Sequence, residues 1–296
     1  MFHWGEFALE SFIRVAGGSA IFLVVLIFLF LLREGIPVLW EVDFSNLLNI
    51  RWYPTFDLFG ILPLLYGSLI VTAGAIILSV PLGVATATYM REIAPSWVRE
   101  ILKPLIEVIA GIPSVVLGFL GMVVVAPLVQ RWLGLPTGLT AFTGSLMLAY
   151  MALPTIISIA EDAIDAVPKS YRDGALALGA THWQTIYRVV LPAARSGILT
   201  AVLLGLGRAI GETMAVMMVT GNAARMPHEW AALFRPVRTM TATIAAEMGE
   251  VAEGSVHYHM LFAVGVILFL ITFAINTVAS TFALQRETRR GGRLMH

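Results

Sequence analysis

Residues 161–197 read EDAIDAVPKSYRDGALALGATHWQTIYRVVLPAARSG and form a polar, amphipathic interruption in an otherwise apolar chain. Pro168 suits the first turn of a helix, where its missing N–H needs no partner. Gly179 is expected to end that helix. A second helix is expected over residues 182–190, before Pro192 stops it. The stretch therefore predicts a helix–glycine–helix projection, which is suited to docking onto another protein.

The sequence on either side of this projection is too apolar for a water-soluble protein. Of its 296 residues, 58% are hydrophobic and 13% are charged, and the mean hydropathy is +0.84. Soluble domains carry about 25% charged residues, so the chain is expected to be an integral membrane protein. The formal net charge is zero and the basic residues form no stripe, so no nucleic-acid partner is expected.

Six segments are long and apolar enough to cross a bilayer of about 30 Å as helices. The first is expected to be a retained span, because it lacks the small-residue cleavage pattern of a signal peptide. Residues 1–296 are therefore expected to form a single all-α transmembrane domain. The spans are expected near residues 13–33, 62–89, 105–130, 138–160, 196–221 and 257–284.

The distribution of Lys and Arg predicts the orientation, because cytoplasmic loops are enriched in these residues. Both termini of a six-span chain lie on one side, and that side is expected to be the cytoplasm, together with residues 161–195. Twelve basic residues fall on the side of the termini and five on the other. The twelve are Arg14, Arg91, Arg99, Lys103, Lys169, Arg172, Arg188, Arg195, Arg286, Arg289, Arg290 and Arg293, and the five are Arg51, Arg131, Arg225, Arg235 and Arg238.

The segment 161–195 resembles the EAA coupling loop of ATP-binding-cassette importer permeases. That loop has an acidic residue and two alanines, three residues, Gly, nine residues and Ile-x-Leu-Pro. Asp replaces Glu, Gly replaces the first Ala and Val replaces Ile, but the spacing is kept in full. The resemblance implies a six-helix type I importer permease fold (MetI-like) and an ATPase onto which the loop docks. The matching residues are Asp173, Gly174, Ala175, Gly179, Val189, Leu191 and Pro192.

The chain itself is not expected to be an enzyme. Its two lysines, Lys103 and Lys169, are not preceded by Gly, so it has no phosphate-binding loop of the Walker type. It has no Cys, and no pairing of a nucleophile with a base is visible. His257 and His259 are not expected to bind a metal. No cofactor is expected.

Five longer stretches resemble the PstC-type permeases of phosphate-specific importers. The sister PstA type resembles the chain in part. The resemblance implies import of inorganic phosphate across the inner membrane of a prokaryote. It also implies a second homologous permease subunit, two ATPase subunits and an extracytoplasmic phosphate-binding protein. The stretches are FGILPLLYGSLIVT (59–72), LKPLIEVIAGIPSVVLGFLG (102–121), GRAIGETMAV (207–216), RTMTATIAAEMGE (238–250) and SVHYHMLFAVGVILFLITF (255–273).

Two charges, Arg208 and Glu212, fall in the middle of the fifth predicted span. Arg208 is twelve residues beyond the expected start at 196, or roughly 18 Å along a helix. A charge near the bilayer centre costs about 2.5–3.5 kcal/mol on insertion scales. On the helix expected there, the two charges share a stripe of small residues. The stripe also holds Ala201, Gly205, Gly211 and Ala215.

Two interpretations of this pair stay open. The pair could neutralise itself as an i, i+4 ion pair that only holds helices together. Alternatively, it could line an anion path, in which Glu212 holds Arg208 while the path is empty. Arg208 would then bind phosphate through its planar guanidinium, and Glu212 would accept a hydrogen bond from a protonated phosphate oxygen.

Three further residues are weaker candidates for the path. Ser114 follows Pro113, which is expected to kink the third span and free backbone groups there. Thr213 adjoins the two charges, and Asn222 lies at the outer end of the fifth span. Outside the path, Glu107 is expected to pair with a lysine four residues before it.

Two alternative functions remain at this stage. The chain could be a permease of the same fold for another anion. It could instead be a proton-coupled carrier that uses Arg208 and Glu212 as a relay. The segment 161–195 argues against a carrier, because a carrier needs no element that docks onto an ATPase.

Overall fold

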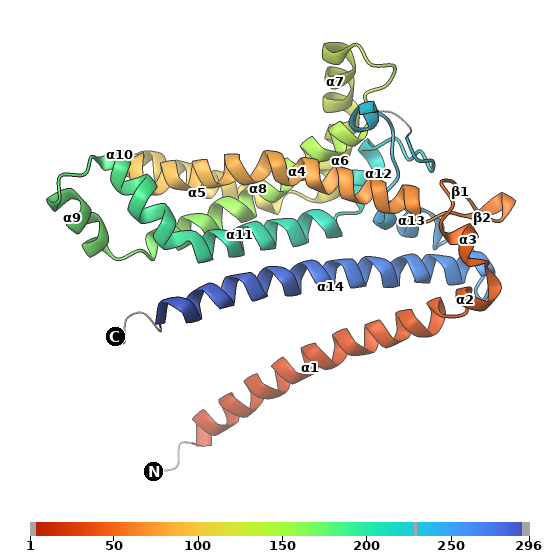
Figure 1. Ribbon diagram of the computed structural model, residues 1–296, viewed down its shortest axis with the longest axis horizontal. Helices are drawn as coiled ribbons and strands as arrows, with labels where there is room; N and C mark the ends of the chain where they lie inside the picture. The colour runs from red at the N-terminus through yellow and green to blue at the C-terminus, as the bar shows by residue number, and fades with distance from the viewer. Residues whose placement is uncertain (1–3, 228–229, 292–296) are drawn as a thin grey trace.

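The computed structural model describes residues 4–227 and 230–291, and the chain folds into a bundle of long helices (Figure 1). Six helical segments within these residues are long and apolar enough to cross a membrane, which confirms the all-α, six-span prediction. The beginning of the first helix and the end of the last lie at the same end of the bundle as the loop helices α9 and α10. The spans are Leu9–Glu41, Leu62–Ile93, Ser114–Leu133, Ala141–Asp165, His182–Gly211 and Val256–Thr277.

Helix α8 (Ala141–Asp165) is the centre of the bundle, with α4 (Leu62–Thr88) and α11 (Leu191–Gly211) packed against it. Glycines on both neighbours make this close approach possible. A Cβ atom at Gly83 of α4 would lie 2.7 Å from Ile156 Cγ2, and one at Gly205 of α11 would lie 2.5 Å from Ile156 Cγ1. Ile156 is fully buried, so α8 is the helix on which the other two are positioned.

Helices α1 (Trp4–Gly35) and α14 (Val256–Gly291) pair along one side of this bundle (Figure 1). The Phe28 and Phe269 rings stack with their centroids 4.7 Å apart. Most of the apolar side chains of α1 that the structure describes are exposed on the chain, as expected for a membrane-spanning helix whose sides face lipid.

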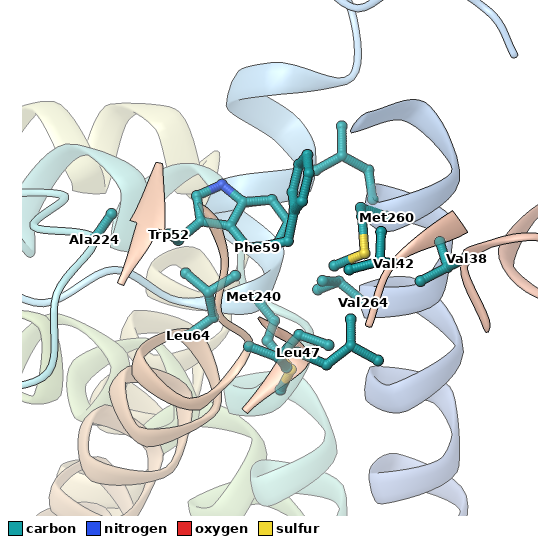
Figure 2. Close-up of a cluster of buried hydrophobic side chains, with 12 residues drawn as sticks. Val38, Val42, Leu47, Trp52, Phe59, Leu64, Ala224, Met240, Met260 and Val264 are labelled. Carbon is teal, nitrogen blue, oxygen red and sulfur yellow. The ribbon is translucent and has the colours of Figure 1, made fainter. Parts of the chain in front are cut away.

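Short elements close the end of the bundle opposite α9 and α10. Trp52 and Phe59 lie in a two-stranded antiparallel sheet and pack in a buried cluster with side chains of α4, α13 and α14 (Figure 2). The cluster therefore joins the two parts of the bundle. The elements are α2 (Val38–Glu41), α3 (Phe44–Leu47), β1 (Trp52–Tyr53), η1 (Pro54–Phe56), β2 (Leu58–Phe59), η5 (Trp230–Phe234) and α13 (Met240–Glu247).

The third predicted span, 105–130, is divided instead of continuous. A separate helix, α5, ends at Gly111, and the next helix begins at Ser114. Between them, Ile112 and Pro113 are extended, with ψ of 127° and 137°, because a residue before proline avoids the helical region. The membrane-length helix therefore starts later than expected. The elements are α5 (Ser96–Gly111), α6 (Ser114–Leu120), η3 (Gly121–Val125) and α7 (Ala126–Leu133).

The fifth span begins at His182 instead of 196, and the prediction that Pro192 stops the helix is wrong. The chain runs from α10 (His182–Thr185) through η4 (Ile186–Val190) into α11. Because η4 is a π-helical turn, the wider turn before Pro192 relieves the clash that a proline makes in an α-helix. A second π-helical turn, η2 (Tyr89–Ile93), extends α4.

The first half of the projecting loop folds as expected. Helix α9 (Lys169–Ala177) starts directly after Pro168. Its last helical residue is Ala177, and Gly179, two residues later, has a φ of +84°. The N–H groups of Gly179 and Ala180 donate to the carbonyls of Leu176 and Ala175 at 2.9 and 3.1 Å, which is the Schellman pattern that favours glycine.

Candidate functional site

Two helix breaks lie next to each other at an exposed face of the chain. One separates α5 from α6, and the other separates α11 from α12 (Met214–Val219). Helices α6 and α12 are in close contact, because a Cβ atom at Gly118 would lie 2.8 Å from the Cα atom of Ala215. Broken helices free backbone groups for a solute at membrane depth, so the paired breaks define the candidate site.

Arg208 lies in the last turn of α11 and reaches both neighbouring helices. Its Nη1 donates to Thr155 Oγ1 of α8 at 3.2 Å, and its Nη2 donates to the Ala110 carbonyl of α5 at 3.5 Å. Both acceptors are neutral, and no carboxylate of the described residues pairs with Arg208. The guanidinium is exposed on the surface of the single chain and keeps its full charge available to an anion.

Glu212 lies beyond the end of α11, in extended conformation with ψ of 130°. Its Oε1 accepts a hydrogen bond of 3.2 Å from the Ala215 N–H, so the carboxylate caps α12. Its backbone carbonyl accepts a hydrogen bond of 3.0 Å from Thr241 Oγ1 of α13. Helix α12 therefore holds the Glu212 carboxylate next to the break, and α13 holds the Glu212 backbone.

The expected i, i+4 ion pair between Arg208 and Glu212 does not form, although both residues are described. The helix ends at Gly211, so the two side chains are no longer one turn apart. The expected stripe is divided for the same reason. Ala201 and Gly205 are buried, and Gly205 packs on α8, whereas a Cβ atom at Gly211 would meet nothing within 4 Å.

The structure brings only some of the weaker candidates to the breaks. Thr213 is at the break, with its hydroxyl donating to the Gly211 carbonyl at 3.2 Å. Ser114 is half-buried as the first residue of α6. Asn222 lies at the other end of α12, where its φ is +50° and its Nδ2 donates to the Met217 carbonyl at 2.8 Å.

Two threonines at the site were not predicted. Thr155 accepts from Arg208, and Thr241 donates to the backbone of Glu212. Thr155 follows Pro154 inside an apolar span, and a hydroxyl in that position is a signal that sequence inspection could use. The role of Thr241 depends on how α13 packs, which no local pattern carries.

The loop helix α9 is anchored to the bundle through Arg172. Its guanidinium donates to Glu92 at 2.6 and 3.1 Å and to the carbonyls of Val167 and Ile164 at 2.6 and 3.0 Å. The Glu92 side chain is only 6% exposed, so this ion pair ties α9 to the end of α4.

The loop helices α9 and α10 expose apolar side chains. Leu178 is 91% exposed and Trp183 is 66% exposed, and such a surface indicates a protein partner. Asp173, Gly174 and Ala175 lie on α9 beside it, Gly179 ends α9, and Leu191 and Pro192 begin α11.

The expected pair between Lys103 and Glu107 is replaced by a contact with α8. Lys103 Nζ donates to Glu161 Oε2 at 2.9 Å, and Asp162 lies 3.9 Å away. The hydrogen bond to Glu161, together with the charge of that carboxylate, raises the pKa of Lys103 above its ordinary value. The ammonium therefore stays charged and holds α5 against α8.

Curated relatives align with most of the chain. It is 39% identical to "Phosphate transport system permease protein PstC" of Mesorhizobium japonicum over 267 residues, which cover 84% of this chain and 80% of the relative. It is 42% identical to "Probable ABC transporter permease protein YqgH" of Bacillus subtilis over 234 residues, which cover 78% of this chain and 74% of the relative.

Solved importers share the fold at low sequence identity. A bacterial ABC transporter involved in the import of the acidic polysaccharide alginate matches with a TM-score of 0.63 and 15% identity, over 95% of this chain and 98% of that one. The MetNI methionine ABC transporter in an inward-facing conformation matches with a TM-score of 0.59 and 17% identity, over 76% and 96%.

A family model described as "Binding-protein-dependent transport system inner membrane component" matches residues 79–289. This match covers both helix breaks and the loop helices α9 and α10. The chain is therefore a multi-pass membrane protein that belongs to the binding-protein-dependent permease family of ABC importers.

Proposed function

We propose that this chain is a permease subunit of an ATP-driven importer of inorganic phosphate. The observation that carries the proposal is Arg208, a permanent cation with only neutral partners, placed where two broken helices meet. A relative named as a phosphate permease is 39% identical over 84% of the chain, and this supports phosphate as the anion. Residues 1–296 form one transmembrane domain in this proposal.

The geometry gives Arg208 and Glu212 separate roles. Arg208 is free to exchange its two weak neutral partners for the oxygens of phosphate, which suit its planar donors. Glu212 uses Oε1 to cap α12, and its carboxylate accepts a hydrogen bond from a protonated phosphate oxygen. Sulfate carries no proton at neutral pH and repels the carboxylate, so the pair selects against sulfate.

Thr213, Ser114 and Asn222 complete the path in this proposal. Thr213 and Ser114 stand at the two breaks, and Asn222 stands at the far end of α12. One six-residue helix, about 9 Å long at 1.5 Å per residue, separates Asn222 from Glu212. A solute that follows α12 would therefore pass from Asn222 to Arg208.

The continuous fifth span gives the proposal a coupling route. The helix from His182 to Gly211 has 30 residues, or about 45 Å, and it carries the loop helix α10 at one end and Arg208 at the other. Docking of the exposed apolar face of α9 and α10 onto an ATPase would move this helix as a rod. Closure of the ATPase would then displace Arg208 from the phosphate.

The assembly in this proposal has several partners. A second homologous permease completes the path, two ATPase subunits engage the coupling loops, and an extracytoplasmic phosphate-binding protein delivers the solute. The Lys and Arg distribution favours cytoplasmic termini and a cytoplasmic coupling loop in the inner membrane of a prokaryote.

Uptake of labelled phosphate tests the proposed substrate. The chain and its partner subunits are expressed in cells that lack their own phosphate importers, with arsenate and sulfate as competitors. We expect uptake that arsenate blocks and sulfate leaves unchanged, because arsenate shares both the shape and the proton of phosphate. Assembly of the complex with no phosphate uptake would refute phosphate as the substrate, and uptake without ATP hydrolysis would indicate a proton-coupled carrier.

A further inference from the structure

A second basic site lies at the end of the bundle opposite the coupling loop. It is a pocket of about 400 Å³ that adjoins the outer end of α12 and contains Arg51, Arg225 and Arg235, which we call the outer arginine pocket. The proposed function does not use it. The remaining lining residues are Ile50, Ala223, Met226, Pro227 and Pro236.

The backbone brings two of these arginines together. Arg51 and Arg225 pair in an isolated antiparallel bridge, in which the Trp52 N–H donates to the Ala224 carbonyl at 2.9 Å and the Met226 N–H donates to the Ile50 carbonyl at 3.1 Å. Trp52 is 1% exposed and fixes this bridge to the buried cluster of Figure 2.

The third arginine is held by a different part of the backbone. The Arg235 carbonyl accepts from the Ala141 N–H at 3.0 Å, and Val237 N–H donates to the Thr220 carbonyl at 2.9 Å. Arg235 is thereby joined to the start of α8 and the end of α12. The pocket is assembled by hydrogen bonds between distant segments and is not the chance meeting of surface side chains.

Two of the arginines in this pocket, Arg51 and Arg225, have no partner charge among the described residues. No Asp or Glu is found among its described lining residues. In the part of the chain that the structure describes, the side chains of Arg51 and Arg225 have no hydrogen bond or ion pair. Like charges that converge on one cavity repel each other, and a bound anion would turn this repulsion into attraction.

We propose that the outer arginine pocket binds a small tetrahedral oxyanion of the phosphate class before it enters the path along α12. This inference rests on the proposed function. Guanidinium groups on separate segments of the chain give several planar donors that match such an anion. Ala223 lines the pocket just past the end of α12, and Glu212 caps the other end of the same helix. The chain thus places two basic sites in series.

Protection from phenylglyoxal, which modifies guanidinium groups, tests binding directly. The full chain with its partner subunits is placed in bilayers of zwitterionic lipid, and adducts at each arginine are measured by mass spectrometry. We expect inorganic phosphate to slow modification of Arg51 and Arg225 by about fivefold compared with chloride of equal ionic strength, because bound phosphate occupies their donors. Exposed Arg131 on α7 is the matched control and should be modified at the same rate in phosphate and in chloride.

Further labelling experiments, with anionic lipid or with the binding protein, identify what occupies the pocket. Equal rates for Arg51 and Arg225 with phosphate and chloride would overturn the inference. The inference would also be overturned if inorganic phosphate gave no protection and the two arginines were protected instead by anionic lipid or by the binding protein without phosphate. The Arg208→Gln chain should retain the protection, because Arg208 lies outside the pocket. The labelling thus decides this inference independently of transport, while wild-type uptake decides the proposed function.

Transport kinetics give a second test. The double variant Arg51→Gln/Arg225→Gln should take up phosphate about tenfold more slowly at limiting concentration, because capture loses its charge attraction. Uptake at saturating phosphate should stay within twofold of wild type, which also shows that the variant folds. Arg131→Gln should match wild type at both concentrations. An unchanged rate of the double variant at limiting phosphate would count against the pocket.

Discussion

Arg208 and Glu212 are four residues apart, yet they belong to different helices. Arg208 lies in the last turn of α11 and donates to Thr155 and to the carbonyl of Ala110, while Glu212 caps α12. A helix break lies between them, so each side chain faces the candidate site separately. This arrangement leaves the guanidinium without a carboxylate partner among the described residues, as an anion site requires.

The first prediction concerns the two functions of Glu212. The Glu212→Gln variant keeps an oxygen that can cap α12 but loses the carboxylate. We expect wild-type thermal stability with at least tenfold slower phosphate uptake. The Glu212→Ala variant should also lose about 1 kcal/mol of stability, the typical value of a helix cap. Melting of the purified complex and labelled uptake measure the two effects. Normal uptake by Glu212→Gln would contradict the role of the carboxylate.

The second prediction concerns Thr241, whose hydroxyl donates to the backbone carbonyl of Glu212. The Thr241→Val variant keeps the shape of the side chain and removes this hydrogen bond. We expect a loss of about 1 kcal/mol in stability and slower phosphate uptake, because the helix break is less well held. The Thr241→Ser variant keeps the hydroxyl and serves as the control. If the Thr241→Val and Thr241→Ser variants have the same stability and the same uptake, Thr241 does not position Glu212.

The third prediction concerns the contact between α6 and α12. A Cβ atom at Gly118 would lie 2.8 Å from the backbone of Ala215. The Gly118→Ala variant should therefore lose about 1–3 kcal/mol of stability through overpacking. At Gly207 of α11 a Cβ atom would meet nothing within 4 Å, so Gly207→Ala is the matched control and should melt at or above the wild-type temperature. Equal melting of the two variants would show that the helices are not closely packed.

Much of this architecture could be predicted because it depends on composition and spacing. Long apolar segments identified the six spans, and the glycine at 179 identified the end of α9. The break after Gly211 was missed because apolar residues continue on both sides of it, in α11 and in α12. Pro192 was misjudged because the π-helical turn that accommodates it has no simple sequence signal. Thr241 reaches the site only through the packing of α13.

The fourth prediction separates coupling from ATP hydrolysis. The Glu92→Gln variant removes the buried charge that holds Arg172 on α9. Breaking a buried ion pair in this way costs about 3 kcal/mol, so the coupling loop should be held less firmly. We expect the assembled complex to hydrolyse ATP at the wild-type rate but to transport phosphate several-fold more slowly. Measured together, the two rates give the number of ATP molecules used per phosphate.

Exposed Glu100 on α5 provides the matched control for this coupling test. Its Glu100→Gln variant makes the same chemical change outside the loop anchor and should keep the wild-type ratio of hydrolysis to transport. A wild-type ratio in Glu92→Gln would show that the ion pair with Arg172 has no part in coupling.

The central claim is that Arg208 binds the transported anion at the two helix breaks. Labelled-phosphate uptake by the Arg208→Gln and Arg208→Lys variants, with complex assembly measured in parallel, tests it most directly. We expect both complexes to assemble. Arg208→Gln should lose at least 99% of uptake, a 100-fold effect that corresponds to about 3 kcal/mol. Arg208→Lys should retain a few per cent, because a charge without the planar guanidinium replaces only part of the interaction. Wild-type uptake and unchanged anion preference in Arg208→Gln would contradict the account.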